Sequence, residues 1–425
     1  MKTQNLNFRS KCKPWLTWLA LYLLIMLPLQ AADNINQNLN INQALARALV
    51  SNPSLNLFDQ EMRMAEARVL TASLLLNPQL ETELEDFGGS GAYSGTDSAT
   101  YNVGLSQLFR LGGKRRAGMA QKTAEKKALA LTYEVRKRLV SEEVGRRFVG
   151  VLKAQQMEQN RKNILSISEE SAKAVKAKVE GGRGSSINLN QAELSVMNAR
   201  LSYQTAAQRT NIARIQLAAL WNKSEVDFKK AVGFLSAPPA QLRSLAKYQD
   251  SLQNHPDLEL AEASLQLAHK SLGFQKSQRV PNLRLGLGYR RDSSIDESAL
   301  VLGASLPLPL FNRNQGGIAE AKASIDRGTQ QRSNAFAGLQ VRLSQAYSEL
   351  AVSHMASRLI VTELMPKARD SFKATEESHR LGRTTYLQLL VAQRNLTAII
   401  ERQTEAFAQF HQARITIEAL TGKTL

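Results

Sequence analysis

The chain has 425 residues, with 24 Gly, 11 Pro and a single Cys, and 43% of its residues are hydrophobic. That length allows two or three domains, and the composition excludes collagen-like and low-complexity disordered proteins. One Cys excludes an intramolecular disulfide framework and a Cys-rich metal site. The formal net charge is +18, so binding to nucleic acid or to an anionic surface has to be weighed.

The first 32 residues have the order of a secretory signal peptide. Residues 1–13 are basic and acid-free, residues 15–29 are mostly apolar, and Gln30-Ala31-Ala32 supplies small residues for cleavage. The apolar run is shorter than the roughly 20 residues that a membrane-spanning helix needs, which disfavours the alternative of an uncleaved anchor. Cys12 precedes the apolar run, whereas a lipoprotein cysteine would follow it. We therefore expect an exported chain that is not lipidated.

Export also argues against binding to nucleic acid. Beyond residue 32, 51 Lys and Arg face 37 Asp and Glu, and the bases are spread along the chain apart from Lys114-Arg115-Arg116. No later segment has 18 uncharged apolar residues in a row. We expect no nucleic-acid partner and no transmembrane helix.

The rest of the chain is an internal repeat. Asn52-Pro53 recurs as His255-Pro256 at an offset of 203, and Gly182-Arg183 recurs as Gly382-Arg383 at an offset of 200. The predicted units are an N-terminal segment at 33–51, a first repeat at 52–222, a linker at 223–254 and a second repeat at 255–422.

Each repeat is predicted to hold a helix, two strands, a very long helix, a Gly-containing turn and a second helix. The first copy places them at 53–76, 80–85, 101–107, 114–180 and 187–221, and the second at 256–278, 283–290, 300–310, 315–380 and 386–421. The long stretches are rich in good helix formers and would span roughly 100 Å. Such a helix, paired across the turn, predicts an antiparallel coiled-coil hairpin. Pro366 should bend or interrupt its helix.

The predicted strands alternate between apolar and polar or small residues. Leu80, Thr82 and Leu84 alternate with acids, and Leu283, Leu285 and Leu287 alternate with Arg284 and two glycines. This period is typical of a transmembrane β-strand, although an ordinary half-buried sheet is the alternative for each strand alone. Four strands cannot close a membrane barrel, and an open edge cannot sit in lipid. Several copies would have to share one barrel, and three copies supply twelve strands.

Several segments resemble the TolC-like outer-membrane efflux protein family. One is residues 39–55, from Leu39-Asn40-Ile41 to Asn52-Pro53-Ser54-Leu55, and another is residues 382–393, which begin Gly382-Arg383-Thr384-Thr385. Residues 107–115, with Phe109-Arg110-Leu111-Gly112-Gly113-Lys114, and residues 306–314, with Leu306-Pro307-Leu308-Pro309, are similar to its heavy-metal subgroup of the cobalt-zinc-cadmium (CzcC) type. The resemblance covers nearly the whole exported chain.

The resemblance implies a fold that is mainly α with a transmembrane β-barrel. The expected assembly is a homotrimer in the lipid of the outer membrane of a Gram-negative bacterium, with a twelve-stranded barrel and a periplasmic coiled-coil tunnel. Its expected partners are a periplasmic membrane-fusion adaptor and an inner-membrane pump of the resistance-nodulation-division type. The protein would then be no enzyme and need no cofactor, because it supplies a passive exit for divalent cations such as cobalt, zinc or cadmium.

The hairpin turns are the candidate adaptor contacts. Gly residues there permit turn conformations, and the resemblance adds that these turns lie at the periplasmic mouth of the tunnel. Arg183 and Arg383 are either partners for acids on a neighbouring hairpin or solvated charges. The candidate positions are Gly182, Arg183, Gly184, Ser185, Leu381, Gly382, Arg383 and Thr384.

Relatives often carry a ring of carboxylates just beyond the second turn, and this sequence departs from that pattern. The matching positions are Gln388 and Val391, with Asn188 in the first copy, so a strong acidic cation filter is not expected there. In the barrel, Glu81, Glu83 and Glu85 are candidates to face the lumen. Arg284 and Arg290 oppose them, so no selectivity follows.

The sequence shows no catalytic motif and no metal-ligand spacing. The five His residues are scattered, and no P-loop, HExxH or GxSxG pattern occurs. The alternatives that remain are the same duct serving multidrug efflux or type I protein secretion, and a periplasmic coiled-coil adaptor without a pore. An adaptor should have one hairpin between compact β domains, whereas this sequence predicts two hairpins and four strands.

Overall fold

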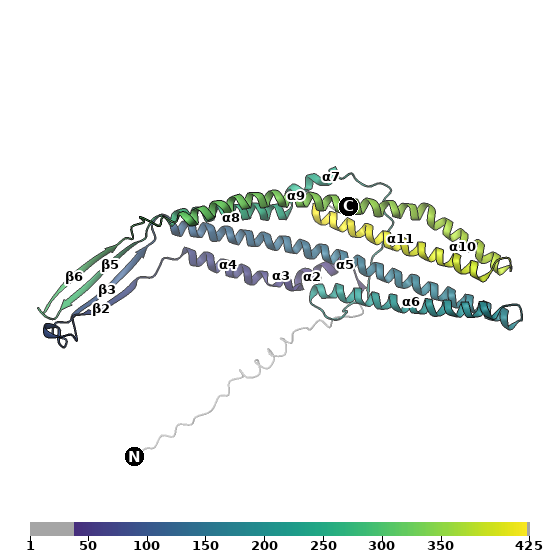
Figure 1. The fold of residues 1–425 in the computed structure, drawn as a ribbon, viewed down its shortest axis with the longest axis horizontal. Coiled ribbons are helices and arrows are strands. Elements are labelled where there is room, and N and C mark those ends of the chain that lie inside the picture. Colours follow the sequence, from purple (N-terminus) through teal and green to yellow (C-terminus); the bar gives the residue numbers. More distant parts are fainter. Residues whose placement is uncertain (1–37, 423–425) are drawn as a thin grey trace, which may run out of the picture.

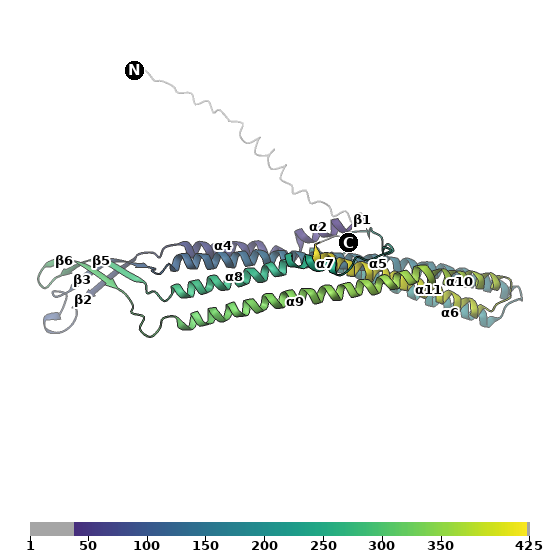
Figure 2. The ribbon, with the colours of Figure 1, turned by 90° about the horizontal axis from the view of Figure 1, so that it is seen from above.

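The computed structural model describes residues 38–422 of the protein. It is a long, narrow molecule with a β-sheet at one end and the turns of two helical hairpins at the other (Figures 1 and 2). The predicted signal peptide, with its cleavage site and Cys12, lies outside the described residues.

The two halves of the chain repeat one order of elements. The first contains α3 (Pro53–Asn56), α4 (Phe58–Ser73), β2 (Gln79–Glu85), β3 (Thr100–Phe109), α5 (Lys114–Glu180) and α6 (Ser186–Ala218). The second contains α8 (Pro256–Ser277), β5 (Leu283–Asp292), β6 (Glu297–Ser305), α9 (Gln315–Leu359), α10 (Met365–Arg380) and α11 (Tyr386–Thr421). The predicted sequence of helix, strand pair, long helix and returning helix is confirmed in both copies.

Three details differ from the predicted ranges. The helix expected at 53–76 is split into α3 and α4 and ends at Ser73. The strand expected to reach residue 310 ends at Ser305, because Pro307 and Pro309 lack the backbone N–H that a sheet needs. The second strand loop is short, since β5 continues to Asp292 and β6 begins at Glu297.

Pro366 interrupts its long helix as predicted. A single π-turn at Ile360–Leu364 lies between α9 and α10, and the Met365 N–H bonds to the Ile360 carbonyl. A proline one residue further on cannot donate to the preceding turn, and its ring crowds the carbonyl four residues back. The wider turn accommodates that defect, as π-bulges do elsewhere.

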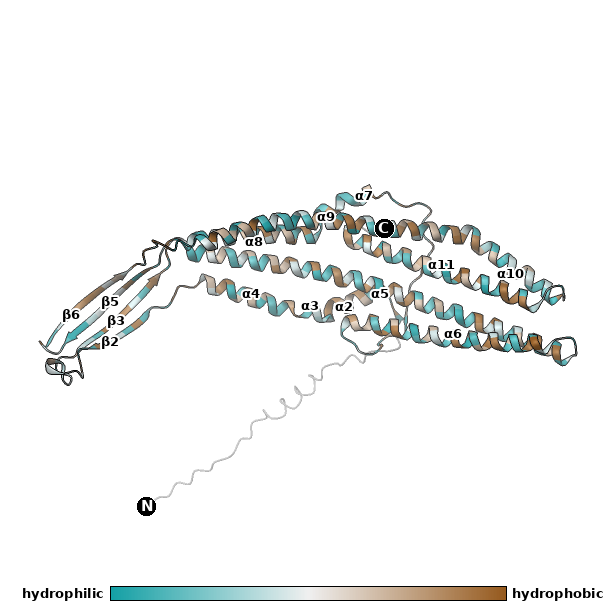
Figure 3. Ribbon diagram, in the orientation of Figure 1, coloured by the Kyte–Doolittle hydropathy of each residue, from teal (hydrophilic) through white to brown (hydrophobic). Residues whose placement is uncertain are grey.

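The sheet is antiparallel throughout, in the order β2-β3-β5-β6. Its register aligns Leu80, Leu105, Leu287 and Leu302 in one row, and Glu81, Gly104, Gly288 and Val301 in the next. Because neighbouring residues of a strand point to opposite faces, one face is apolar and the other polar or small. The coloured ribbon shows this mixture along the strands (Figure 3).

The helical body has one apolar cluster for each repeat near its middle. The first joins α2 (Ile41–Ser51), α5 and α6 around Phe148 and Trp221, and the second joins α9 and α11 around Leu343 and Phe410. Two short strands, β1 (Asn38–Leu39) and β4 (Lys230–Ala231), pair in parallel beside the first cluster. The predicted linker therefore contributes β4 and the short helices α7 (Ala246–Gln249) and Asp250–Asn254. No helix within residues 38–422 is long and apolar enough to cross a membrane.

Candidate functional site

The first hairpin turn joins α5 to α6 through a Schellman motif. Gly182 has a φ of +69°, its N–H bonds to the Val179 carbonyl at 3.0 Å, and the Arg183 N–H bonds to the Lys178 carbonyl at 2.9 Å. A Cβ on Gly184 would lie 2.9 Å from the Val179 backbone nitrogen, so the turn also requires a residue without a side chain there. Ser185 then caps α6 by accepting from the Ile187 N–H.

The second turn, between α10 and α11, repeats the same geometry. Gly382 has a φ of +74°, and the Arg383 N–H bonds to the Ser378 carbonyl at 2.8 Å. His379 Nδ1 lies 3.1 Å from the Thr384 carbonyl oxygen and adds a contact across the turn. The repeated Gly-Arg pair therefore supplies, in both copies, the left-handed residue and the following N–H that this motif needs.

The two turn arginines are exposed and lack ion-pair partners among the described residues. Arg183 and Arg383 are exposed, and neither forms an ion pair within the described part of the chain. Their charges are thus available to a molecule outside this chain. The alternative pairing with a hairpin of another copy stays a prediction.

The candidate constriction residues have different local roles. Gln388 forms a capping box with Thr385, accepting the Thr385 N–H at 2.9 Å while its own N–H bonds to Thr385 Oγ1 at 3.3 Å. Val391 is exposed one turn further along α11, and Asn188 is half-buried on α6. Gln388 therefore starts α11 and lies close to the hairpin turn.

A seam of contacts holds the two hairpins against each other along α5 and α11. Buried Asn160 donates to Thr404 Oγ1 at 3.2 Å, and Gln393 donates to Ser168 Oγ at 3.4 Å. Near the turns, Tyr386 is buried in an apolar cluster with Val175 and Leu389, among others. Burial raises the pKa of Tyr386, and its side chain shares a hydrogen bond with Ser171, which acts in the opposite direction.

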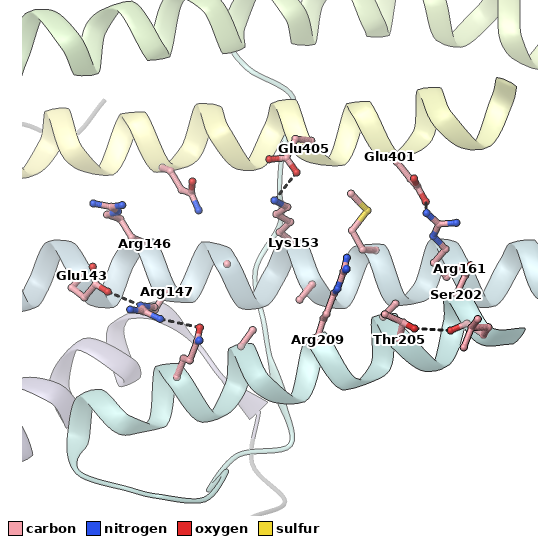
Figure 4. Close-up of a pocket in the computed structure, with 18 residues that line it drawn as sticks. Glu143, Arg146, Arg147, Lys153, Arg161, Ser202, Thr205, Arg209, Glu401 and Glu405 are labelled. Atoms are coloured by element: carbon pink, nitrogen blue, oxygen red, sulfur yellow. Dashed lines mark hydrogen bonds and ion pairs between the residues drawn. The ribbon is translucent and has the colours of Figure 1, made fainter. Parts of the chain in front are cut away.

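A charged groove of about 830 Å³ lies between α6 and α11 on one side of α5 (Figure 4). Lys153 Nζ is 2.5 Å from Glu405 Oε2, and Arg161 Nη2 is 2.6 Å from Glu401 Oε1. The groove is thus crossed by ion pairs that join the hairpins. Sequence reasoning missed these seam and groove residues, because pairs between α5 and α11 are more than 200 residues apart and no local spacing marks them.

The structure brings all five sheet candidates to one face. Glu81, Glu83 and Glu85 alternate along β2, and the register places Arg290 in the row of Glu83. Arg284 Nη1 donates across β3 to Glu81 Oε1 at 3.3 Å. That reach is possible because the intervening residues are Ser106 and glycines, and Ser106 Oγ itself donates to Glu81 at 2.5 Å. The positive and negative candidates therefore neutralise each other in part.

The described residues contain no group of three or more His, Cys, Asp and Glu side chains able to hold a metal ion. The buried histidines have structural partners instead. His255 accepts the Asp257 N–H at the start of α8, and His411 lies 3.1 Å from the Ser236 carbonyl oxygen.

The fold is that of the TolC-like channels. A solved structure of CusC, described as forming a transmembrane channel, superposes with a TM-score of 0.70 and 17% identity, covering 92% of this chain and 94% of that one. The four-stranded sheet and the paired helical hairpins thus belong to a known fold.

The chain belongs to the outer membrane efflux protein family, whose model matches residues 44–223 and 247–423. Two curated relatives are metal-resistance proteins. The cobalt-zinc-cadmium resistance protein CzcC of Cupriavidus metallidurans is 28% identical over 91% of this chain and 90% of its own length. The nickel-cobalt-cadmium resistance protein NccC of Alcaligenes xylosoxydans xylosoxydans is 26% identical over 72% of this chain and 70% of its own.

Proposed function

We propose that this outer-membrane efflux protein is the passive exit duct of a tripartite system that exports divalent metal cations. One structural observation is the main support for a duct. A four-stranded sheet with an apolar face and the open edges β2 and β6 is continuous with two helical hairpins, whose longest helix, α5, spans about 100 Å. An open edge is unstable in lipid, so the sheet needs other copies to complete it.

Three copies, each supplying four strands, give an even-numbered barrel of twelve, which is within the usual range. The long hairpins would then enclose a periplasmic tunnel. The proposed units are the repeats at 52–222 and 255–422, with the 33–51 segment and the 223–254 linker around the middle of the tunnel.

The hairpin turns are the proposed contact with a periplasmic adaptor, and through it with an inner-membrane pump of the resistance-nodulation-division type. Both turns are exposed, share one backbone geometry and carry an arginine that forms no ion pair with residues 38–422. Gln388, Val391 and Asn188 lie next to them as the proposed narrow entrance, which carries no acidic ring.

Similarity to metal-resistance proteins over most of the chain supports a metal cargo. The duct itself needs no metal site, because tight binding would slow release. The energy comes from the pump, so the proposed role involves no catalysis and no cofactor. The same duct serving drugs or a secreted protein is the alternative, since cargo is selected upstream.

The assembly is tested by fractionating cells and examining the exported chain without boiling. We expect it in the outer-membrane fraction, migrating at trimer mass and shifting to monomer mass on heating. Recovery only from the soluble periplasmic fraction would contradict the duct. Purified trimers should also conduct ions across a planar bilayer, which a closed scaffold without a pore would not do.

A further inference from the structure

The chain passes between sheet and helices four times, and none of these passages contains an acid. Residues 67–80, 98–124, 263–291 and 298–319 contain no Asp and no Glu. They connect α4 to β2, β3 to α5, α8 to β5 and β6 to α9. Their bases are Arg68, Arg110, Lys114, Arg115, Arg116, Lys122, Lys270, Lys276, Arg279, Arg284, Arg290, Arg291 and Arg313.

The start of α5 breaks a local rule of helix stability at this junction. Its first turn holds Lys114, Arg115 and Arg116 with no acid, and Gly113 provides no side-chain cap. The amino end of a helix carries partial positive charge, so cations there are unfavourable and an anion is favoured. Among the described residues, Lys114 and Arg115 find only neutral acceptors, namely Asn282 Oδ1 at 2.6 Å and the Ser73 carbonyl at 3.2 Å.

Four exposed arginines form what we call the junction collar: Arg115, Arg116, Arg279 and Arg313. None of them forms an ion pair within residues 38–422. Further down the same helices ion pairs are frequent, as between Lys126 and Glu66 at 2.8 Å. Acid-free stretches also occur elsewhere, as at residues 194–224, but at the junction all four passages lack acids, and their exposed bases leave a positive collar there.

Exposed apolar side chains lie beside the collar, mostly where the outer strands β2 and β6 meet the helices. Phe311 is 91% exposed, Leu75 is 75% exposed and Leu308 is 71% exposed. This junction belt comprises Leu74, Leu75, Leu76, Leu111, Leu306, Leu308, Leu310 and Phe311. Apolar groups next to unpaired cations are typical of protein surfaces at the boundary between acyl chains and headgroups.

We propose that the junction collar binds the phosphates of an anionic phospholipid leaflet while the junction belt enters its acyl region. The inference rests on the proposed duct, because the collar reaches headgroups only if the sheet lies in the bilayer. Arginine suits this ligand, since its planar guanidinium binds phosphate oxygens in pairs. The bound phosphates also supply the anion that the start of α5 lacks.

The test uses the full exported chain, as trimers, in vesicles of phosphatidylcholine doped with brominated lipid. In a Phe311→Trp reporter, tryptophan fluorescence is quenched by nearby brominated lipid. The quenching by brominated phosphatidylglycerol is compared with that by brominated phosphatidylcholine. Since each base near an anionic surface contributes about 1 kcal/mol, we expect at least about fivefold stronger association with the anionic lipid. Replacing the four collar arginines by Gln should bring that ratio close to one. Arg183→Gln with Arg383→Gln, at the far end of the molecule, is the matched control and should leave it unchanged.

A second reporter, Leu302→Trp on the apolar sheet face, separates the two hypotheses. Absence of quenching at that position would contradict membrane insertion and with it the proposed function. Quenching of Leu302→Trp, combined with equal quenching of Phe311→Trp by both lipids, would contradict the binding of anionic lipid by the collar but leave the duct intact. If neither brominated lipid quenched Phe311→Trp, lipid binding by the belt would also be contradicted, because another copy of the chain would then cover it.

Discussion

At the scale of single residues, the two turns depend on glycine for a conformational reason. A Cβ on Gly382 would meet no atom within 4 Å, so only its φ of +74° opposes a side chain. We expect Gly382→Ala to destabilise the turn by about 1 kcal/mol. Gly338→Ala, inside α9 with equally open space, should instead stabilise by about 0.5–1 kcal/mol. Thermal unfolding of both variants measures the two stability changes. Melting temperatures that shift in the same direction would contradict the role given to the left-handed conformation of Gly382.

His255 predicts a specific dependence of stability on pH. Burial is the main cause that lowers its pKa from 6.5 to about 4, with Asp257 opposing and Arg138 and Arg342 assisting. Glu142 lies in the same cluster, 3.7 Å from Arg342. The unfolded chain therefore takes up a proton below pH 6.5 while the folded chain does not. Stability should fall between pH 6.5 and about 4, by about 1.4 kcal/mol for each unit of pKa difference.

His255→Asn separates this effect from that of the other titrating groups. Asn52 occupies the corresponding position in the first repeat and caps its helix through the same kind of side-chain acceptor. The variant should keep the cap but lose the histidine's share of the pH dependence. Denaturant midpoints at pH 7 and pH 5 measure it. An unchanged difference between the two pH values would show that His255 does not contribute.

At the scale of elements, the helices, strands and turns of each repeat could be predicted from the sequence, because the patterns that mark them are local. Alternation, helix formers and the Gly-Arg turns each act over a few residues. Lys153–Glu405 and Asn160–Thr404 were not predictable, since they depend on how two distant helices twist past each other. The end of β6 was missed although Pro307 and Pro309 signalled it, because the alternation of leucines continued through them.

The cluster around Tyr386 should govern how far the hairpins separate. Tyr386 is buried where α11 meets α5, so Tyr386→Ala leaves a cavity at that contact. Spin labels at Arg183→Cys and Arg383→Cys report the distance between the turns, because the single Cys of the sequence, Cys12, lies in the predicted signal peptide. We expect a longer and broader distribution for Tyr386→Ala. Tyr203→Ala, at a half-buried site on α6, should change it little. An identical distribution in both variants would show that this cluster does not hold the turns together.

At the scale of the whole molecule, the two sheet faces predict opposite tolerance to charge. Val301 and Leu302 are neighbours on β6, but their register partners are Gly288 and Leu287, on opposite faces. A basic side chain toward lipid costs roughly 2–4 kcal/mol near the bilayer midplane, and an acidic one costs less but is still unfavourable. Leu302→Asp should therefore reduce the heat-modifiable trimer in outer membranes, whereas Val301→Asp should not. Equal loss in both variants would argue against the assignment of faces.

The proposed metal exit duct should set how much metal a cell retains, so cell-associated metal is the quantity to measure. A strain lacking the gene is loaded with sublethal zinc, cobalt, cadmium, copper and nickel and compared with its parent. We predict excess retention of one or two metals, reversed by the intact gene and by Val301→Asp but not by Leu302→Asp. Unchanged retention of all five metals, with the gene expressed in the parent and no second duct in the strain, would contradict a metal cargo.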